Sequence, residues 1–297
     1  VAATATIGLC ISLLLLVNLP YEQLKGSILY EPSYWYVWVG ALPLAASIVL
    51  CFENRLNPTI RHSVSLLAVL LWSLYGYISN DTPEHFFGAL AFIAPIVTFF
   101  SSLFWVAFLK KDTDTSFWNF SYLLCIQILT GLLFASVLAA GLSLALFSTD
   151  TLFGCEFKSE MYSNIHVLCY TLFFPFYLLG NIPIASITET KVHSFAQAWK
   201  ILGLYILLPL LILYGTILYA YLIKIIIQWQ LPDGWVSALV SILTIGGTIT
   251  LFILYPLCIQ ENRPLKFFRQ WFGILLLPLL ILMTVGIIRR FQDYGIT

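Results

Sequence analysis

The stretch that decides the fold runs from Trp118 to Phe147 and reads WNFSYLLCIQILTGLLFASVLAAGLSLALF. No charged residue occurs in these 30 positions. A helix needs about 20 apolar residues to cross a hydrocarbon core of about 30 Å, and 30 residues of helix extend about 45 Å. The stretch therefore predicts a membrane-spanning helix that tilts, bends or projects beyond the bilayer.

Eight further apolar runs accompany this one. We expect spans at about residues 1–19, 35–52, 64–78, 86–109, 118–147, 165–187, 198–227, 235–259 and 271–288. The chain is 60% hydrophobic and only 9% charged, whereas an ordinary soluble domain carries about 25% charge. The sequence therefore excludes a soluble fold and predicts an all-α protein, a polytopic transmembrane helical bundle of about nine spans.

The connections between the runs are short. The two longest cover residues 20–34 and 148–164, and each is too short to form an independent core. We therefore expect one transmembrane helical domain over residues 1–297. Because the first residue is Val1 and not Met, we interpret the sequence as part of a longer chain.

Most of the runs contain a residue that disturbs helices. These residues are Pro43, Pro95, Gly131, Pro175, Pro209, the pair Gly246 and Gly247, and Pro278. Proline removes a backbone donor and clashes with the preceding turn, so we expect several kinked helices. Kinked helices frame substrate cavities in many transporters, but Pro and Gly are also common in membrane helices without any such role.

Basic residues are divided unevenly between the two sets of loops. The loops after even-numbered runs hold nine of the 14 Lys and Arg residues, and the other loops hold five. Cytoplasmic loops are the ones enriched in Lys and Arg. We therefore expect the Val1 side to be cytoplasmic and the Thr297 side to be periplasmic or external.

Known catalytic motifs do not occur in the chain. The sequence has no GxxxxGK[ST], HExxH, GxSxG or dinucleotide fingerprint, so the NTPase, metalloprotease, hydrolase and Rossmann mechanisms lack their groups. The six cysteines show no metal-ligand spacing. The sequence predicts no cofactor, no metal site and no catalytic residue, and it leans against an enzyme.

Few polar groups lie inside the predicted spans. Gln127 is the deepest amide, and we expect it to hydrogen-bond a neighbouring helix rather than a substrate. No Asp or Glu lies within a span, which argues against proton coupling through this part of the chain. Cys155 lies in a predicted loop, where it either pairs with Cys169 or remains a free thiol.

The strongest candidate site is a cluster of basic and aromatic residues at the predicted outer ends of the seventh and ninth runs. Its members are Tyr219, Tyr221, Lys224, Trp229, Trp235, Arg289, Arg290 and Tyr294. Cations beside aromatic rings at the headgroup level suit a substrate or lipid headgroup that carries a phosphate. The same residues also suit simple interfacial anchors, because Lys and Arg near span ends reach for the headgroups.

This C-terminal part of the chain resembles a known family. Residues 217–224 (ILYAYLIK), 229–237 (WQLPDGWVS), 254–257 (LYPL) and 289–297 (RRFQDYGIT) are similar to the bacterial DUF4153 membrane proteins, mainly over residues 198–297. The resemblance implies a multi-pass protein of the bacterial cytoplasmic (inner) membrane and a continuation of the chain beyond Thr297. It implies no catalytic residues.

Three functions remain open. The leading hypothesis is a transport or envelope-assembly component that handles a lipid-like or small substrate at its outer face. The second is a membrane enzyme that modifies lipid-linked envelope substrates with loop carboxylates such as Glu31, Glu84 and Glu156. The third is a non-catalytic subunit of a membrane complex that contacts its partner through small residues such as 135–141. The expected partners are membrane lipids and, in a complex, another protein, but not nucleic acid.

Overall fold

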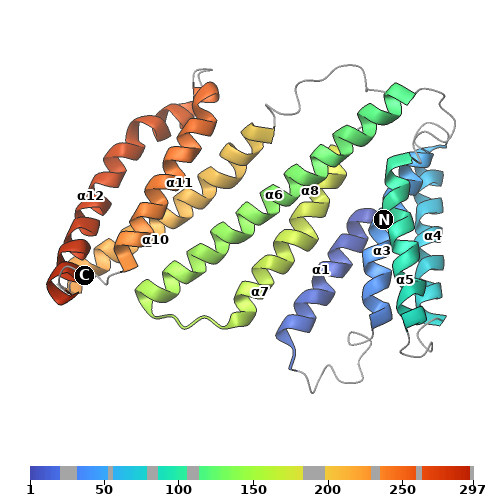
Figure 1. Ribbon diagram of the computed structural model, residues 1–297, viewed down its shortest axis with the longest axis horizontal. Helices are drawn as coiled ribbons and strands as arrows, with labels where there is room; N and C mark the ends of the chain where they lie inside the picture. Colours follow the sequence, from blue (N-terminus) through green and yellow to red (C-terminus); the bar gives the residue numbers. More distant parts are fainter. Residues whose placement is uncertain are drawn as a thin grey trace. The chain divides into compact units, whose positions relative to one another are not determined.

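The computed structural model describes residues 1–20, 32–52, 56–78, 86–105, 114–182, 198–228, 235–258 and 263–294, with only the backbone described at some range ends. All regular secondary structure in these ranges is helical (Figure 1). The predicted all-α class is therefore confirmed.

Helices occupy every one of the nine predicted runs. Their bounds are α1 Ala2–Asn18, α3 Pro32–Cys51, α4 Pro58–Ile78, α5 Phe86–Trp105, α6 Asp114–Phe153, α7 Ser159–Leu168, the π-helix η4 Cys169–Phe173, α8 Phe174–Asn181, the π-helix η5 Leu202–Leu207, α10 Leu208–Gln228, α11 Trp235–Cys258 and α12 Arg263–Tyr294.

Among the described residues, five helical segments are long and apolar enough to cross a membrane. They are Phe117–Phe153, Ser159–Asn181, Ala198–Gln228, Trp235–Leu254 and Phe267–Ile288. Three shorter apolar helices are Ala2–Asn18, Val37–Cys51 and Ile93–Trp105. The chain is thus a multi-pass helical membrane protein, and the number of nine crossings stays a prediction.

Helix α6 is longer than its apolar run. It has 40 residues, which correspond to about 60 Å, twice the thickness of the hydrocarbon core. Gly131 does not interrupt it. Instead, Gly131 allows a close approach, because a Cβ atom there would lie 2.8 Å from Cδ1 of Tyr177.

Two of the residues expected to disturb helices, Pro175 and Pro209, are preceded by π-helical turns rather than by breaks in the helix. The segment η4 ends just before Pro175, and η5 ends just before Pro209. Proline cannot donate a hydrogen bond and collides with the carbonyl four residues earlier, and a π-turn shifts the pairing by one residue. The other prolines, Pro43, Pro95 and Pro278, lie inside α-helices.

The helices form two compact units. Unit 1 comprises residues 1–135 and 163–191, and unit 2 comprises residues 136–162 and 192–297. This division does not test the prediction of a single domain, which stays a prediction.

In unit 1, α3 packs against α1, α4 and α5 (Figure 1). Trp72 of α4 is buried there, and its Nε1 donates a hydrogen bond of 3.0 Å to the carbonyl oxygen of Val37. Gly40 leaves room for this indole, because a Cβ atom at Gly40 would lie 2.8 Å from the Trp72 nitrogen. Small residues on α3 therefore determine how closely α4 approaches.

Polar side chains also join helices of unit 1. The Tyr177 hydroxyl donates a hydrogen bond of 3.2 Å to Oε1 of Gln127, as the sequence predicted for that amide. Asn18 at the end of α1 and Asn164 of α7 exchange two amide hydrogen bonds of 2.9 and 3.0 Å. Both pairs join helices that are distant in the sequence.

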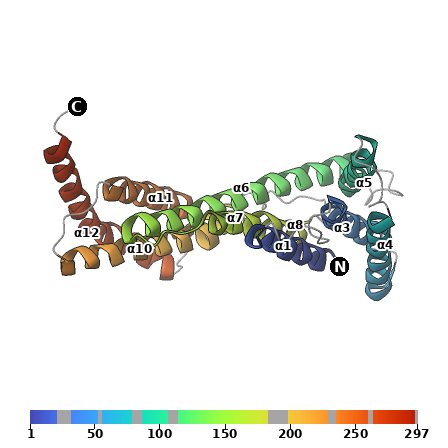
Figure 2. The same ribbon diagram turned by 90° about the horizontal axis from the view of Figure 1, so that it is seen from below.

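In unit 2, α11 packs against both α10 and α12 (Figures 1 and 2). A leucine-rich core joins the three helices and the end of α6; its fully buried members include Leu218, Leu239 and Leu279. Gly247 of α11 lets α12 come close, since a Cβ atom at this position would overlap the ring of Phe272.

Candidate functional site

Lys224 of α10 caps the end of α6. Its Nζ donates a hydrogen bond of 3.0 Å to the carbonyl oxygen of Leu152. The same ammonium lies 5.3 Å from the ring centroid of Phe153 and 5.9 Å from that of Tyr221. The last carbonyls of a helix lack partners in the helix and attract cations, and aromatic faces add a cation–π attraction.

Two other predicted site residues meet the same helix end. Tyr221 is buried, and its ring makes an edge contact with Phe153 at 6.1 Å between centroids. Trp235 at the start of α11 contacts Phe147 edge-on at 5.8 Å. The structure therefore places Tyr221 and Lys224 at the end of α6, and Trp235 against Phe147, six residues earlier in the same helix.

The predicted span ended at Phe147 and so left out the groups that Lys224 contacts. The polar residues of positions 148–151 were interpreted as a loop, but the helix continues through them to Phe153. The signal that marks the true end is Gly154, whose φ of 67° is typical of the glycine that follows a helix. Its N–H donates a hydrogen bond of 2.7 Å to the carbonyl oxygen of Asp150.

Tyr219 has different partners from the rest of the predicted cluster. Its hydroxyl donates a hydrogen bond to the carbonyl oxygen of Leu275 in α12. It lies nine residues before Gln228, the end of α10, which corresponds to about 14 Å along the helix. Tyr219 is therefore deeper along its span than the other residues of the cluster on α10.

The remaining predicted site residues lie outside the part of the chain whose side chains are described. Trp229 falls between α10 and α11, in residues that the structure does not describe. Arg289, Arg290 and Tyr294 belong to α12, but only their backbone is described. Their role at a headgroup site stays a prediction.

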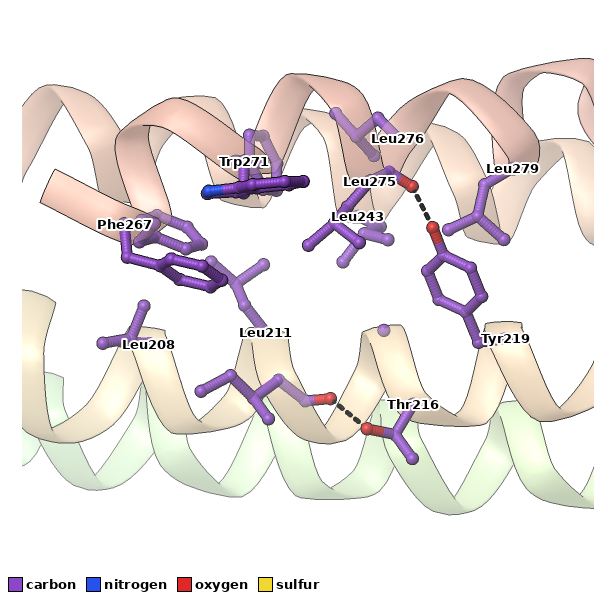
Figure 3. A pocket seen from close by; sticks show the side chains of 14 residues that line it. Leu208, Leu211, Thr216, Tyr219, Leu243, Phe267, Trp271, Leu275, Leu276 and Leu279 are labelled. Carbon is purple, nitrogen blue, oxygen red and sulfur yellow. Dashed lines mark hydrogen bonds between the residues drawn. The ribbon is translucent and has the colours of Figure 1, made fainter. Parts of the chain in front are cut away.

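Unit 2 also contains an apolar pocket that the sequence did not predict (Figure 3). Its volume is about 620 Å³, and it lies between α10 and α12 with one residue from α11. The lining residues are Leu208, Leu211, Ile212, Gly215, Thr216, Tyr219, Leu243, Phe267, Phe268, Trp271, Phe272, Leu275, Leu276 and Leu279.

The two hydroxyl groups that line the pocket are already paired. The Thr216 hydroxyl donates a hydrogen bond of 2.8 Å to the carbonyl oxygen of Ile212, and Tyr219 donates to Leu275. Figure 3 shows Tyr219 reaching from α10 to α12 at one end, with Phe267 and Trp271 at the other. The two rings of that aromatic end stack with 5.6 Å between centroids. The walls therefore suit an apolar ligand.

The comparison with known families covers this region and most of the chain. The family DUF4153, described as a domain of unknown function, matches residues 7–297. The chain belongs to the DUF4153 family. The match confirms the resemblance predicted from residues 198–297 and extends it over the first two thirds of the chain.

A relative of the DUF4153 chain is an uncharacterized protein of Pasteurella multocida. The two are 27% identical over 179 residues, which make up 58% of this chain and 29% of the relative. The chain thus spans less than a third of the length of the curated relative it matches. No solved structure matches.

Other candidate groups of the DUF4153 chain are isolated. Within the described ranges, no three His, Cys, Asp or Glu side chains gather closely enough to hold a metal ion. Of the loop carboxylates considered for catalysis, Glu156 lies in the exposed turn after α6, while Glu31 and Glu84 are outside the described residues. Cys155 is exposed and Cys169 is buried, and the two do not form a disulfide in this structure.

Proposed function

We propose that this DUF4153 protein is a transport or envelope-assembly component of the bacterial inner membrane that binds a lipid-like substrate by an acyl chain. The observation that carries the proposal is the apolar pocket of unit 2. Its volume of about 620 Å³ lies within the range of about 300–1,000 Å³ that is typical of ligand sites.

The chemistry of the walls supports an acyl chain over a polar solute. Leucine, isoleucine and aromatic side chains provide nearly all the surface, and both lining hydroxyls donate to backbone carbonyls. A polar solute would lose its hydration without gaining partners. An acyl chain loses nothing comparable, because the bilayer from which it comes is equally apolar.

The proposed topology has nine crossings with Val1 in the cytoplasm. It rests on the apolar runs and on the uneven distribution of basic residues. Cys155, an exposed free thiol after α6, offers a direct test. A membrane-impermeant maleimide is expected to label Cys155 in intact spheroplasts, with Cys155→Ser as the control. Labelling only after the membrane is opened would reverse the proposed orientation.

Gly215 offers a way to fill the pocket without disturbing the helix. A Cβ atom there would meet no atom within 4 Å, and replacing a helical glycine generally stabilises a helix by about 1 kcal/mol. Gly273 of α12 has the same open surroundings but does not line the pocket. Gly215→Leu and Gly273→Leu therefore form a matched pair.

Native mass spectrometry of the full-length protein, extracted gently from its own membrane, tests the proposal. The wild-type protein and Gly273→Leu are expected to carry bound lipid, and Gly215→Leu is expected to lose it about tenfold, since overpacking costs about 1–3 kcal/mol. Equal lipid binding by all three proteins would refute the pocket as the lipid site.

A further inference from the structure

The two ends of the pocket differ in chemistry. One end contains Phe267 and Trp271, which are 59% and 45% exposed. The other end is bridged by Tyr219, whose hydroxyl joins α10 to the carbonyl oxygen of Leu275. A ligand that enters between α10 and α12 therefore meets aromatic rings at one end and a bridge between the helices at the other (Figure 3).

The aromatic end has the character of a membrane interface. Tryptophan is enriched at the headgroup level of membrane helices, and Trp271 lies eight residues after Arg263, the first residue of α12. Arg269 lies between Phe267 and Trp271 in the chain and is exposed. Helical side chains lean toward the N-terminus, which is the direction of the aromatic end, so Arg269 is placed at the level of the pocket's mouth.

The length of the pocket matches one leaflet. Its lining on α10 runs from Leu208 to Tyr219, which is about 17 Å along a helix. One leaflet provides about half of the hydrocarbon thickness of about 30 Å. On α12 the lining runs from Phe267 to Leu279, about 18 Å along the helix. An acyl chain that starts at the level of Phe267 would thus pass the Tyr219 bridge to Leu275 and end near Leu279, around the middle of the bilayer.

We propose that the pocket holds one acyl chain of an anionic lipid from the leaflet at which α12 begins, with the lipid phosphate beside Arg269. This inference rests on the proposed function and names its ligand class and leaflet. Guanidinium groups bind phosphate oxygens through charge-assisted hydrogen bonds. By the distribution of basic residues this leaflet is the cytoplasmic one, opposite to the outer face at which the cluster around Lys224 is predicted.

The contacts of Lys224 support the placement of the lipid phosphate at the aromatic end of the pocket. Its ammonium donates to the carbonyl oxygen of Leu152 and faces two rings, which is a helix-capping role. Arg269, in contrast, does not line the pocket, so its replacement leaves the walls around the acyl chain unchanged. The binding of the lipid headgroup and the binding of the acyl chain can therefore be tested separately.

The test uses the full-length protein reconstituted in vesicles of equal parts phosphatidylglycerol and phosphatidylcholine, with bound lipid identified by native mass spectrometry. The wild-type protein is expected to be enriched in phosphatidylglycerol. Arg269→Gln is expected to lower this enrichment about fivefold while total bound lipid stays constant, because one basic residue near the membrane surface contributes about 1 kcal/mol. Arg269→Lys retains most of the enrichment, and Lys158→Gln, which removes an exposed charge after α6, changes nothing.

Each alternative result has a distinct meaning. An unchanged enrichment in Arg269→Gln, together with lipid loss in Gly215→Leu, overturns the headgroup assignment and leaves the acyl-chain pocket in place. Loss of enrichment in Lys224→Ala but not in Arg269→Gln overturns the assignment in favour of the opposite end. Retention of lipid in Gly215→Leu refutes the proposed function itself.

Discussion

In unit 1, helices are joined by pairs of side chains, as Gln127 with Tyr177 and Asn18 with Asn164, as well as by the bond from Trp72 to a backbone carbonyl. In unit 2, tyrosine and lysine side chains reach across to backbone carbonyls, for example from Tyr214 to Leu239. A tyrosine that bonds to a backbone carbonyl holds two helices apart by the length of a rigid ring. In unit 2 one such bond, from Tyr219 to Leu275, lies at one end of the apolar pocket.

Replacing Trp72 is expected to lower the free energy of unfolding more than any other change, because it disrupts the packing of unit 1. Trp72→Ala removes a buried indole that contacts Phe99 edge-on at 5.1 Å, and we expect a loss of about 3–5 kcal/mol. Trp72→Phe keeps a ring and loses the hydrogen bond to Val37, for about 1 kcal/mol. Thermal unfolding in mild detergent measures both. Equal losses would mean that the hydrogen bond, and not the ring, stabilises this helix contact.

Two adjacent glycines of α11 test how closely this helix packs against its neighbours in unit 2. A Cβ atom at Gly247 would overlap Phe272, whereas one at Gly246 would lie 3.5 Å from Leu211 in an ordinary contact. Gly247→Ala is therefore expected to destabilise the protein by about 1–3 kcal/mol, and Gly246→Ala to stabilise it by up to about 1 kcal/mol. The two melting temperatures, measured under the same conditions, check the opposite signs. Shifts of the same sign would show that α11 and α12 do not meet at Gly247.

Tyr214 tests the bonds from side chain to backbone in unit 2. Its buried hydroxyl donates a hydrogen bond of 3.0 Å to the carbonyl oxygen of Leu239. Tyr214→Phe is expected to cost about 1 kcal/mol in unfolding free energy. Tyr205→Phe is the matched control, because Tyr205 is exposed and its change is expected to have no effect. A loss at both positions would mean that the hydroxyl groups act through solubility and not through helix contacts.

Gln127 tests the corresponding pair in unit 1, with the smallest expected effect. Gln127→Leu and Tyr177→Phe each remove the hydrogen bond between these side chains, for about 0.6 kcal/mol, the average for such bonds in membrane proteins. Tyr177→Phe also removes the longer contact of 3.4 Å with the Thr130 hydroxyl. The double variant is expected to cost little more than either single one, which a double-mutant cycle measures. Additive losses would show that the two side chains stabilise the fold independently.

Much of the fold could be predicted because helix formation in a membrane is a local property. A run of about 20 apolar residues must form a helix, since unpaired backbone groups are costly in lipid. The boundaries were less predictable: α6 extends past the polar residues 148–151 and ends before Gly154, where Lys224, far along the chain, contacts it. The π-turns before Pro175 and Pro209 were anticipated only as kinks.

The candidate headgroup site stays a prediction, because the side chains of Trp229, Arg289, Arg290 and Tyr294 lie outside the described residues. The sequence grouped Tyr221, Lys224 and Trp235 with Tyr219, whose hydroxyl bonds to α12. It did not include Leu152 and Phe153, which Lys224 contacts. The pocket could not be predicted at all. Its lining comes from residues 208–219, 243 and 267–279, and all of them look like ordinary lipid-facing or core positions when the chain is considered alone.

The sequence by itself determined that this chain forms apolar helices in a membrane, because hydrophobicity and backbone pairing depend only on residues near one another. It also determined which residues carry charge, and hence the predicted orientation. Only the tertiary structure decided which faces of α10 and α12 meet, since that depends on the rotation of each helix about its axis and on the shapes of distant side chains. The pocket beside Tyr219 and the capping role of Lys224 follow from those contacts.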